Sequence, residues 1–204
     1  VNAINIEAGG DNFVIRGCKF GPGEAATDEC ADYIIVEAGA NRGVIENNHF
    51  EAGAQAAVSA VELNGAVIGI KIVNNYFTGD YSTAILRGDT TLSQDVFIAN
   101  NHLMNGVTGG LNTEPVIEML TGTTGYITDN RMFCNVGAPN LAVVCDGAFM
   151  SGNSYNEVAG SHVGGGAPDY NPLLGYRVSA ADAASPQGTV TNIFTIVTGR
   201  VLVT

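Results

Sequence analysis

The sequence predicts an all-β fold in which about six short repeats stack as successive coils around one elongated core. Two observations support this prediction. The first is a short phrase that recurs six times, at 14–20, 44–50, 71–77, 97–103, 126–132 and 149–155, in which an apolar residue is followed by polar, turn-forming residues and then by a large apolar residue. The second is that another apolar stretch precedes each copy of this phrase. Such a unit cannot bury its own apolar face, so neighbouring copies must stack.

Each phrase contributes to two apolar columns. The second residue of the phrase is in turn Ile15, Ile45, Ile72, Ile98, Ile127 and Met150. The closing residue is Phe20, Phe50, Phe77, Leu103, Met132 and Tyr155. Both columns advance by the same steps of 30, 27, 26, 29 and 23 residues. We therefore expect both columns to lie inside the core, held by Ile45, Ile72, Phe50 and Phe77.

The preceding apolar stretches occupy 3–9, 33–39, 60–65, 83–89, 115–120 and 142–147. In the first three repeats, nine residues separate the last large apolar residue of this stretch from the Ile column, as between Ile6 and Ile15. Brief β-branched runs broken by Gly, Asn and Asp favour strands over helices. We expect two or three strands per coil, paired in parallel with the next coil about 4.8 Å away.

A column of Asn residues accompanies the apolar columns: Asn48, Asn75, Asn101, Asn130 and Asn153. Asn tolerates the left-handed backbone of a tight turn, and stacked Asn side chains form hydrogen bonds from layer to layer. We therefore predict a structural ladder. The next position carries the polar series Lys19, His49, Tyr76, His102, Arg131 and Ser154, which should face solvent.

Composition limits the possible functions. The 204 residues include 46% hydrophobic and 14% charged residues, which favours an ordered core. Eight Lys and Arg against twenty Asp and Glu give a net charge of -12. This charge repels phosphate backbones and anionic lipids, so we expect no nucleic-acid partner and no membrane partner. No apolar run reaches the roughly 20 residues that a membrane span requires.

The four Cys residues show neither Cys-x-x-Cys spacing nor nearby His, so we expect no zinc or other metal site. Cys18 stands at the Asn position of the first repeat, and Cys145 lies in an apolar run. We interpret both as small buried residues. Nothing in the sequence indicates a cofactor.

Taken together, the repeats of residues 1–163 resemble the right-handed parallel β-helix of the pectin-lyase-like proteins. This fold hosts polysaccharide lyases, hydrolases, adhesins and viral spike proteins. The resemblance implies that an active site would contain an acidic cluster. The polygalacturonase motif set is missing, and only Asn112-Thr113-Glu114 is similar to any part of it.

The best carboxylate pair for an enzyme is Glu7 and Glu37, at equal places in IEAG and VEAG. We expect them on adjacent coils about 5 Å apart, close to the roughly 5 to 5.5 Å of a retaining glycosidase. Any two acids in one column share this spacing, so we favour solvated glutamates over catalysis. The same reasoning applies to Glu62 with Glu118 and to Asp129 beside Arg131. With no Trp and 7% aromatics, glycan binding is also disfavoured.

Beyond the repeats, residues 164–175 form a Gly and Pro-rich linker and residues 176–204 a small C-terminal β element. Its last run, 189–204, carries apolar residues on both faces and needs a partner surface. A three-fold bundle would cover both faces and remove the exposed edges. The run is similar to terminal segments of tailed-phage particle proteins. The candidate assembly residues are Ile193, Phe194, Ile196, Val201 and Val203.

These features predict a non-enzymatic structural virion protein: a homotrimeric β-helical bacteriophage spike, fibre or capsid decoration protein that contacts other virion proteins. The alternative is a phage tailspike depolymerase, a glycosidase or lyase acting on host surface glycans. A third class is a bacterial adhesin or secreted lyase. The chain begins at Val1 without Met and ends within an apolar run. We therefore expect these residues to belong to a longer polypeptide.

Overall fold

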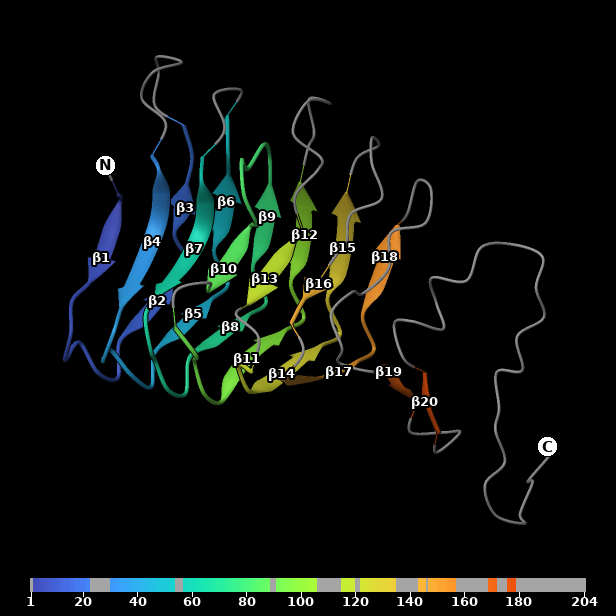
Figure 1. The fold of residues 1–204 in the computed structure, drawn as a ribbon. Helices are drawn as coiled ribbons and strands as arrows, with labels where there is room; N and C mark the ends of the chain where they lie inside the picture. Colours follow the sequence, from blue (N-terminus) through green and yellow to red (C-terminus); the bar gives the residue numbers. More distant parts are fainter. Residues whose placement is uncertain are drawn as a thin grey trace, which may run out of the picture.

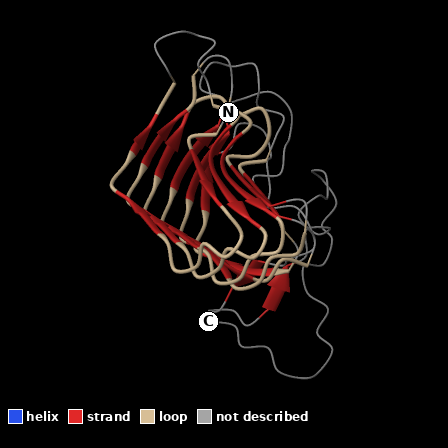
Figure 2. Cartoon of the chain, turned by 90° about the vertical axis from the view of Figure 1, so that its left-hand side faces the viewer, coloured by secondary structure: helices blue, strands red, loops and turns tan. Residues whose placement is uncertain are grey.

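Three parallel sheets, each of six strands, wind around a common core and form a parallel β-helix (Figure 1). The all-β prediction is therefore confirmed. The computed structural model describes residues 2–22, 30–53, 57–88, 91–105, 115–119, 122–134, 143–145, 147–156, 169–171 and 176–178. Within these ranges no helix is long and apolar enough to cross a membrane. Seen along the stack, the strands of successive coils lie one behind another (Figure 2).

Each coil contributes one strand to each sheet. Sheet A contains β1 (Ile4–Ile6), β4 (Asp32–Glu37), β7 (Ser59–Asn64), β10 (Leu86–Gly88), β13 (Ile117–Met119) and β16 (Val143–Val144). Sheet B contains β2 (Val14–Arg16), β5 (Val44–Glu46), β8 (Lys71–Val73), β11 (Val96–Ala99), β14 (Gly125–Thr128) and β17 (Ala148–Ser151). Sheet C contains β3 (Lys19–Phe20), β6 (His49–Glu51), β9 (Tyr76–Thr78), β12 (His102–Asn105), β15 (Arg131–Cys134) and β18 (Ser154–Asn156).

The register aligns the predicted apolar columns. In sheet B, Ile45 pairs with Ile72, and Ile72 pairs with Ile98. All three side chains are fully buried. In sheet C, the rings of Phe50 and Phe77 stack at 4.7 Å between centroids. As far as their side chains are described, both columns lie inside the core, because side chains alternate across a strand and every second residue of a strand points inward.

The tight turn between sheets B and C corrects one detail of the sequence interpretation. The left-handed residues in these turns are Gly17, Asn47, Asn74, Asn100, Asp129 and Gly152, with φ between 54° and 68°. They stand one position before the Asn column, whose members are not among the left-handed residues. The left-handed conformation thus falls on the first residue of each pair. The second residue is buried at Asn48, Asn75, Asn101 and Asn130, and half-buried at Asn153.

A second correction concerns Cys18, which is exposed rather than buried. Its Sγ atom lies 3.6 Å from the carbonyl oxygen of Arg16. The first coil lies at the end of the stack, so no preceding coil among the described residues covers this turn. Cys145 is buried, as the sequence predicts.

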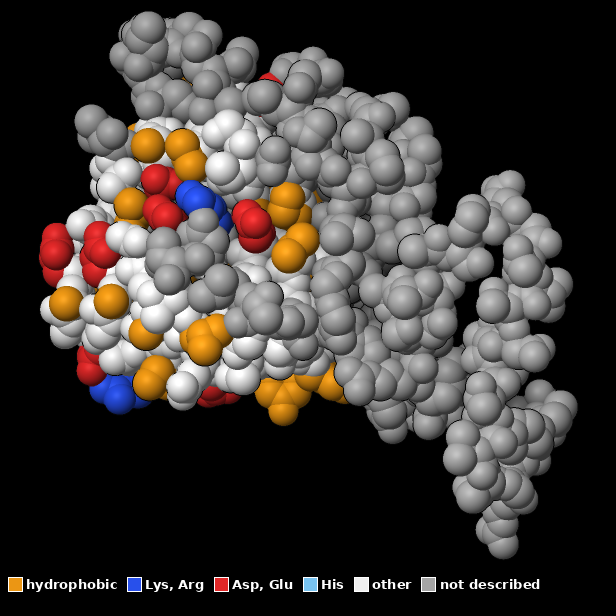
Figure 3. Space-filling view, in the orientation of Figure 1, with side chains coloured by type: hydrophobic (Ala, Val, Ile, Leu, Met, Phe, Trp, Pro, Cys, Tyr) orange, Lys and Arg blue, Asp and Glu red, His pale blue; other side chains and the backbone are white. Residues whose placement is uncertain are grey.

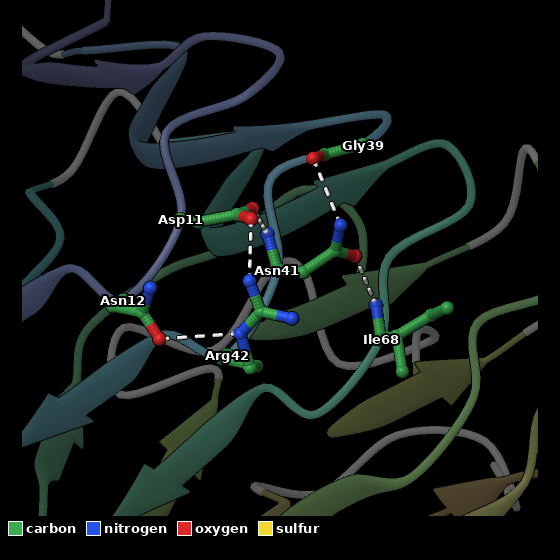
Figure 4. A network of polar contacts seen from close by, with 6 residues as sticks. All are labelled: Asp11, Asn12, Gly39, Asn41, Arg42 and Ile68. Carbon is green, nitrogen blue, oxygen red and sulfur yellow. Dashed lines mark hydrogen bonds and ion pairs between the residues drawn. The ribbon is translucent and has the colours of Figure 1, made fainter.

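The turn from sheet A to sheet B ties the first three coils together (Figure 4). Asp11 Oδ1 accepts from the backbone N of Asn41 at 2.9 Å, and Asp11 Oδ2 accepts from Arg42 Nη2 at 2.6 Å. Arg42 Nε also donates to Asn12 Oδ1 at 3.2 Å. The chain of contacts continues because Asn41 Oδ1 accepts from the backbone N of Ile68 at 2.8 Å. This network fixes the stacking of the turns and so the register of the strands that follow.

At the other end of the chain, β19 (Asp169–Asn171) pairs with β20 (Tyr176–Val178) in antiparallel fashion. This hairpin crosses the boundary that the sequence interpretation sets at residue 175. Its first strand lies beside β17 (Figure 1). The remaining residues of the predicted linker and of the C-terminal β element lie outside the described residues.

Candidate functional site

The outward face of sheet A carries the four glutamates that the sequence analysis considered for catalysis, whereas Asp129 lies in the turn between sheets B and C. This face carries two rows of polar side chains. The first row consists of Glu62, Arg87 and Glu118, and we call it the acid–arginine row. Arg87 pairs in register with Glu62 on one side and with Glu118 on the other. In Figure 3, acidic side chains gather over this face and basic atoms lie between them.

Burial makes this row different from an ordinary surface ion pair. Arg87 Nη1 lies 3.7 Å from Glu62 Oε1, and the two side chains are 26% and 14% exposed. Charges that are partly withdrawn from solvent interact more strongly than fully exposed ones, because less water screens them. Two carboxylates flanking a guanidinium form a partly neutralised cluster that can bind a polar group of a ligand or brace three coils.

The sequence analysis named Glu62 and Glu118 but missed Arg87. A signal for Arg87 was present, since AVELNG, AILRGD and PVIEML place Glu62, Arg87 and Glu118 at equivalent strand positions. The repeat steps vary from coil to coil, so this alignment is clear only once the strand pairing is known.

The second row contains the proposed pair Glu7 and Glu37. Ile6 pairs with Val36, so the two glutamates that follow lie on neighbouring coils. Glu37 Oε2 accepts from Asn64 Nδ2 at 2.8 Å across to the third coil. Glu7 Oε1 accepts from Asn5 Nδ2 at 3.0 Å. Each carboxylate therefore has an amide partner within the outward face, and their use as an acid and nucleophile remains a hypothesis.

The Asn column forms a continuous set of hydrogen bonds beneath the turns. Each side-chain amide donates to the Oδ1 atom of the next Asn over 3.0 to 3.1 Å, from Asn48 through to Asn153. The same Oδ1 atom accepts from the backbone N of the preceding Asn over 2.9 to 3.0 Å. Each Nδ2 atom also donates to a carbonyl of the Ile column, as Asn101 does to Ile72 O at 2.8 Å.

The polar series on sheet C faces outward, with Tyr76 exposed and both His residues half-buried. The Tyr76 ring stacks on His102 at 4.9 Å and meets His49 edge-on at 5.1 Å. Burial, and secondarily the guanidinium of Arg131, lower the pKa of His102 below its ordinary value of 6.5. Within the described ranges, no group of three or more His, Cys, Asp or Glu could hold a metal ion.

The predicted assembly residues Ile193, Phe194, Ile196, Val201 and Val203 lie outside the described residues. Their role remains a prediction. Comparison with protein-family models, curated proteins and solved structures finds no match to this chain.

Proposed function

We propose that this chain is a non-enzymatic structural protein of a virus particle, a homotrimeric β-helical spike, fibre or capsid decoration protein of a tailed bacteriophage. The observation that carries the proposal is the unbroken Asn ladder, in which every buried amide from Asn48 to Asn130 has a partner on the next coil. A fully bonded buried network resists local opening, because exposing any member leaves its partner unsatisfied. A stiff rod suits display and reinforcement.

The phage assignment rests on the resemblance of the C-terminal run to terminal segments of phage particle proteins, and the trimer rests on the two apolar faces of that run. Residues 189–204 would form a three-fold bundle that joins three rods or docks them on other virion proteins. In this arrangement the rod supplies length and the terminal element supplies assembly.

The test is the oligomeric mass of the full chain, measured by sizing with light scattering. The parent should be a trimer, and a variant with both Phe194→Asp and Ile196→Asp should be a monomer that keeps its β circular dichroism. Ile68 and Leu92, exposed at 50% and 47% on the rod, provide the matched control. A variant with Ile68→Asp and Leu92→Asp should stay trimeric. A parent that runs as a monomer, or a Phe194 and Ile196 variant that remains a trimer, would refute the assembly proposal.

A second candidate function is supported by the acid–arginine row. Two half-buried glutamates on either side of Arg87 fit a polysaccharide depolymerase, in which carboxylates act as acid and base or nucleophile. Release of reducing ends from bacterial capsular and O-antigen polysaccharides would test it. Activity that falls at least about a hundredfold in Glu62→Gln and Glu118→Gln, but not in Glu46→Gln, would replace the structural proposal with this one.

A further inference from the structure

The outward face of sheet B carries a row of aromatic side chains that the core does not use. Phe97 pairs in register with Tyr126, and Tyr126 pairs with Phe149. Their ring centroids lie 6.3 and 5.9 Å apart in edge-on contact. Tyr126 is 49% exposed and Phe149 41% exposed. We call Phe97, Tyr126 and Phe149 the aromatic row; apolar side chains gather along the lower margin of Figure 3, where the strands of sheet B lie.

At one end of this row the surface is hollowed. A pocket of about 350 Å³ is lined by Lys71, Asp95, Phe97 and Tyr126. Lys71 precedes Phe97 in the same outward row, since the two residues pair in register between β8 and β11. Neither charged side chain is in an ion pair with another residue in the described part of the chain. The pocket thus offers two ring surfaces, one cation and one anion, and neither charge has an ion-pair partner among the described residues.

From this lining we propose that the pocket and the aromatic row bind an oligosaccharide. A pyranose ring presents an apolar C–H face, which packs on an aromatic ring, and hydroxyl groups at its edge, which both donate and accept hydrogen bonds. Tyr126 and Phe97 supply the rings. Asp95 accepts from hydroxyls and Lys71 donates to them. Pockets lined by aromatic side chains with a few convergent polar groups are typical of small-ligand sites.

Other ligand classes fit this surface less well. Lys and Asp are depleted at the cores of protein–protein interfaces, because both charges would have to be desolvated there. Phosphate-bearing ligands are opposed by Asp95 and by the net charge of -12. An aliphatic ligand would leave both charged groups of the pocket without partners.

The row continues past the pocket to Phe149 on the next coil. The site therefore suits an extended chain of sugars lying along the axis of the β-helix rather than a single ring. The inference departs from the expectation from composition, which disfavoured glycan binding because aromatic residues are few. The few that are present align on one face. The site lies on sheet B, away from the acid–arginine row on sheet A, and the inference is independent of the proposed structural function.

The experiment is calorimetric titration of the full chain with three hexasaccharides: neutral cellohexaose, acidic hexagalacturonate and chitohexaose. At least one should bind at micromolar to millimolar concentration. Tyr126→Ala and Asp95→Ala should each weaken that binding about tenfold or more. Tyr76→Ala is the matched control, because Tyr76 is a 41% exposed tyrosine on the outward face of sheet C. Its affinity should stay within about twofold of the parent.

Three results would overturn the inference. The first is that none of the three hexasaccharides binds at millimolar concentration. The second is equal weakening in the Tyr76→Ala and Tyr126→Ala variants. The third is a change in oligomeric mass in Tyr126→Ala, measured by light scattering, which would identify the face as a contact between copies of the chain. The first two results would not bear on the Asn ladder or on assembly through residues 189–204.

Discussion

The side-chain amide of Asn75 donates to Oδ1 of Asn101 over 3.1 Å, and the same oxygen accepts from the backbone N of Asn75 over 2.9 Å. Both residues are buried, so a single oxygen atom satisfies two donors that water does not reach. Because the relationship repeats along the stack, the loss of one Asn affects two coils.

Replacing Asn101 by Ala should destabilise the protein strongly, because it removes the acceptor of the backbone N of Asn75 and one of the two acceptors of Asn75 Nδ2, which keeps only Ile45 O. Each buried donor without a partner costs about 1 to 3 kcal/mol, so we expect a loss of about 2 to 5 kcal/mol in the free energy of unfolding. Urea unfolding followed by circular dichroism measures it. Asn74→Gly is the control, since Asn74 is exposed with φ of 55°, which glycine adopts readily. Equal midpoints for Asn101→Ala and the parent would show that the ladder contributes nothing.

Replacing Cys18 by Asn should stabilise the first coil. Asn48 Oδ1 accepts only from the backbone N of Cys18 at 2.9 Å among the described residues, whereas the later Oδ1 atoms accept two bonds. The new side-chain amide would supply the missing donor. One additional net hydrogen bond is worth about 0.5 to 1.5 kcal/mol. Cys18→Ala is the control, because it removes the thiol without adding a donor. Equal unfolding midpoints for the two variants would contradict this prediction.

Replacing Phe77 by Asp should abolish cooperative folding, because it places a charge between stacked side chains in a fully buried position. We expect a loss of more than about 4 kcal/mol, measured by thermal melting. Tyr76→Asp is the matched control. Tyr76 is one residue away but points outward, so this variant should lose only the ring contacts with His49 and His102, and its melting temperature should fall far less than that of Phe77→Asp. A Phe77→Asp protein that melts like the parent would mean that the assigned register is wrong.

Acidification should destabilise the protein through His102. Its pKa in the folded state lies below the ordinary 6.5, so between these two values the unfolded chain binds more protons than the folded chain. The contribution of His102 to the free energy of unfolding is therefore complete above pH 6.5 and is lost as the pH falls through the pKa that His102 has in the folded state. Urea midpoints recorded from about pH 5 to pH 7 should vary less with pH in His102→Gln than in the parent.

Arg131 provides an independent check on the same prediction. Its guanidinium is the second cause of the lowered pKa, after burial. Arg131→Gln should raise the pKa of His102 toward 6.5 and narrow the pH window over which stability falls. A pH profile identical to the parent in both the His102→Gln and Arg131→Gln variants would remove His102 from any role in acid sensitivity.

The repeat by itself determined the fold class and the two core columns. The column of Ile15, Ile45 and Ile72 advances by the same steps of 30 and 27 residues as the column of Phe20, Phe50 and Phe77. These side chains must stack, because a short apolar unit has no other way to leave water. The Asn column could also be recognised in the sequence, because it advances by the same steps as the two apolar columns. Sequence reasoning placed the left-handed residue one position too late, since two adjacent Asn residues look alike until the backbone shows which of them turns.

The outward surface was decided only by the tertiary structure. Arg87 lies between Glu62 and Glu118, and Tyr126 lies beside Phe97 and Phe149, because backbone hydrogen bonds between coils fix the strand register. The repeats differ in length, so residues that become neighbours are separated by unequal stretches of sequence. Burial forces the inward residues into a recognisable pattern. No comparable force constrains the outward residues, so only the folded coil shows which of them meet.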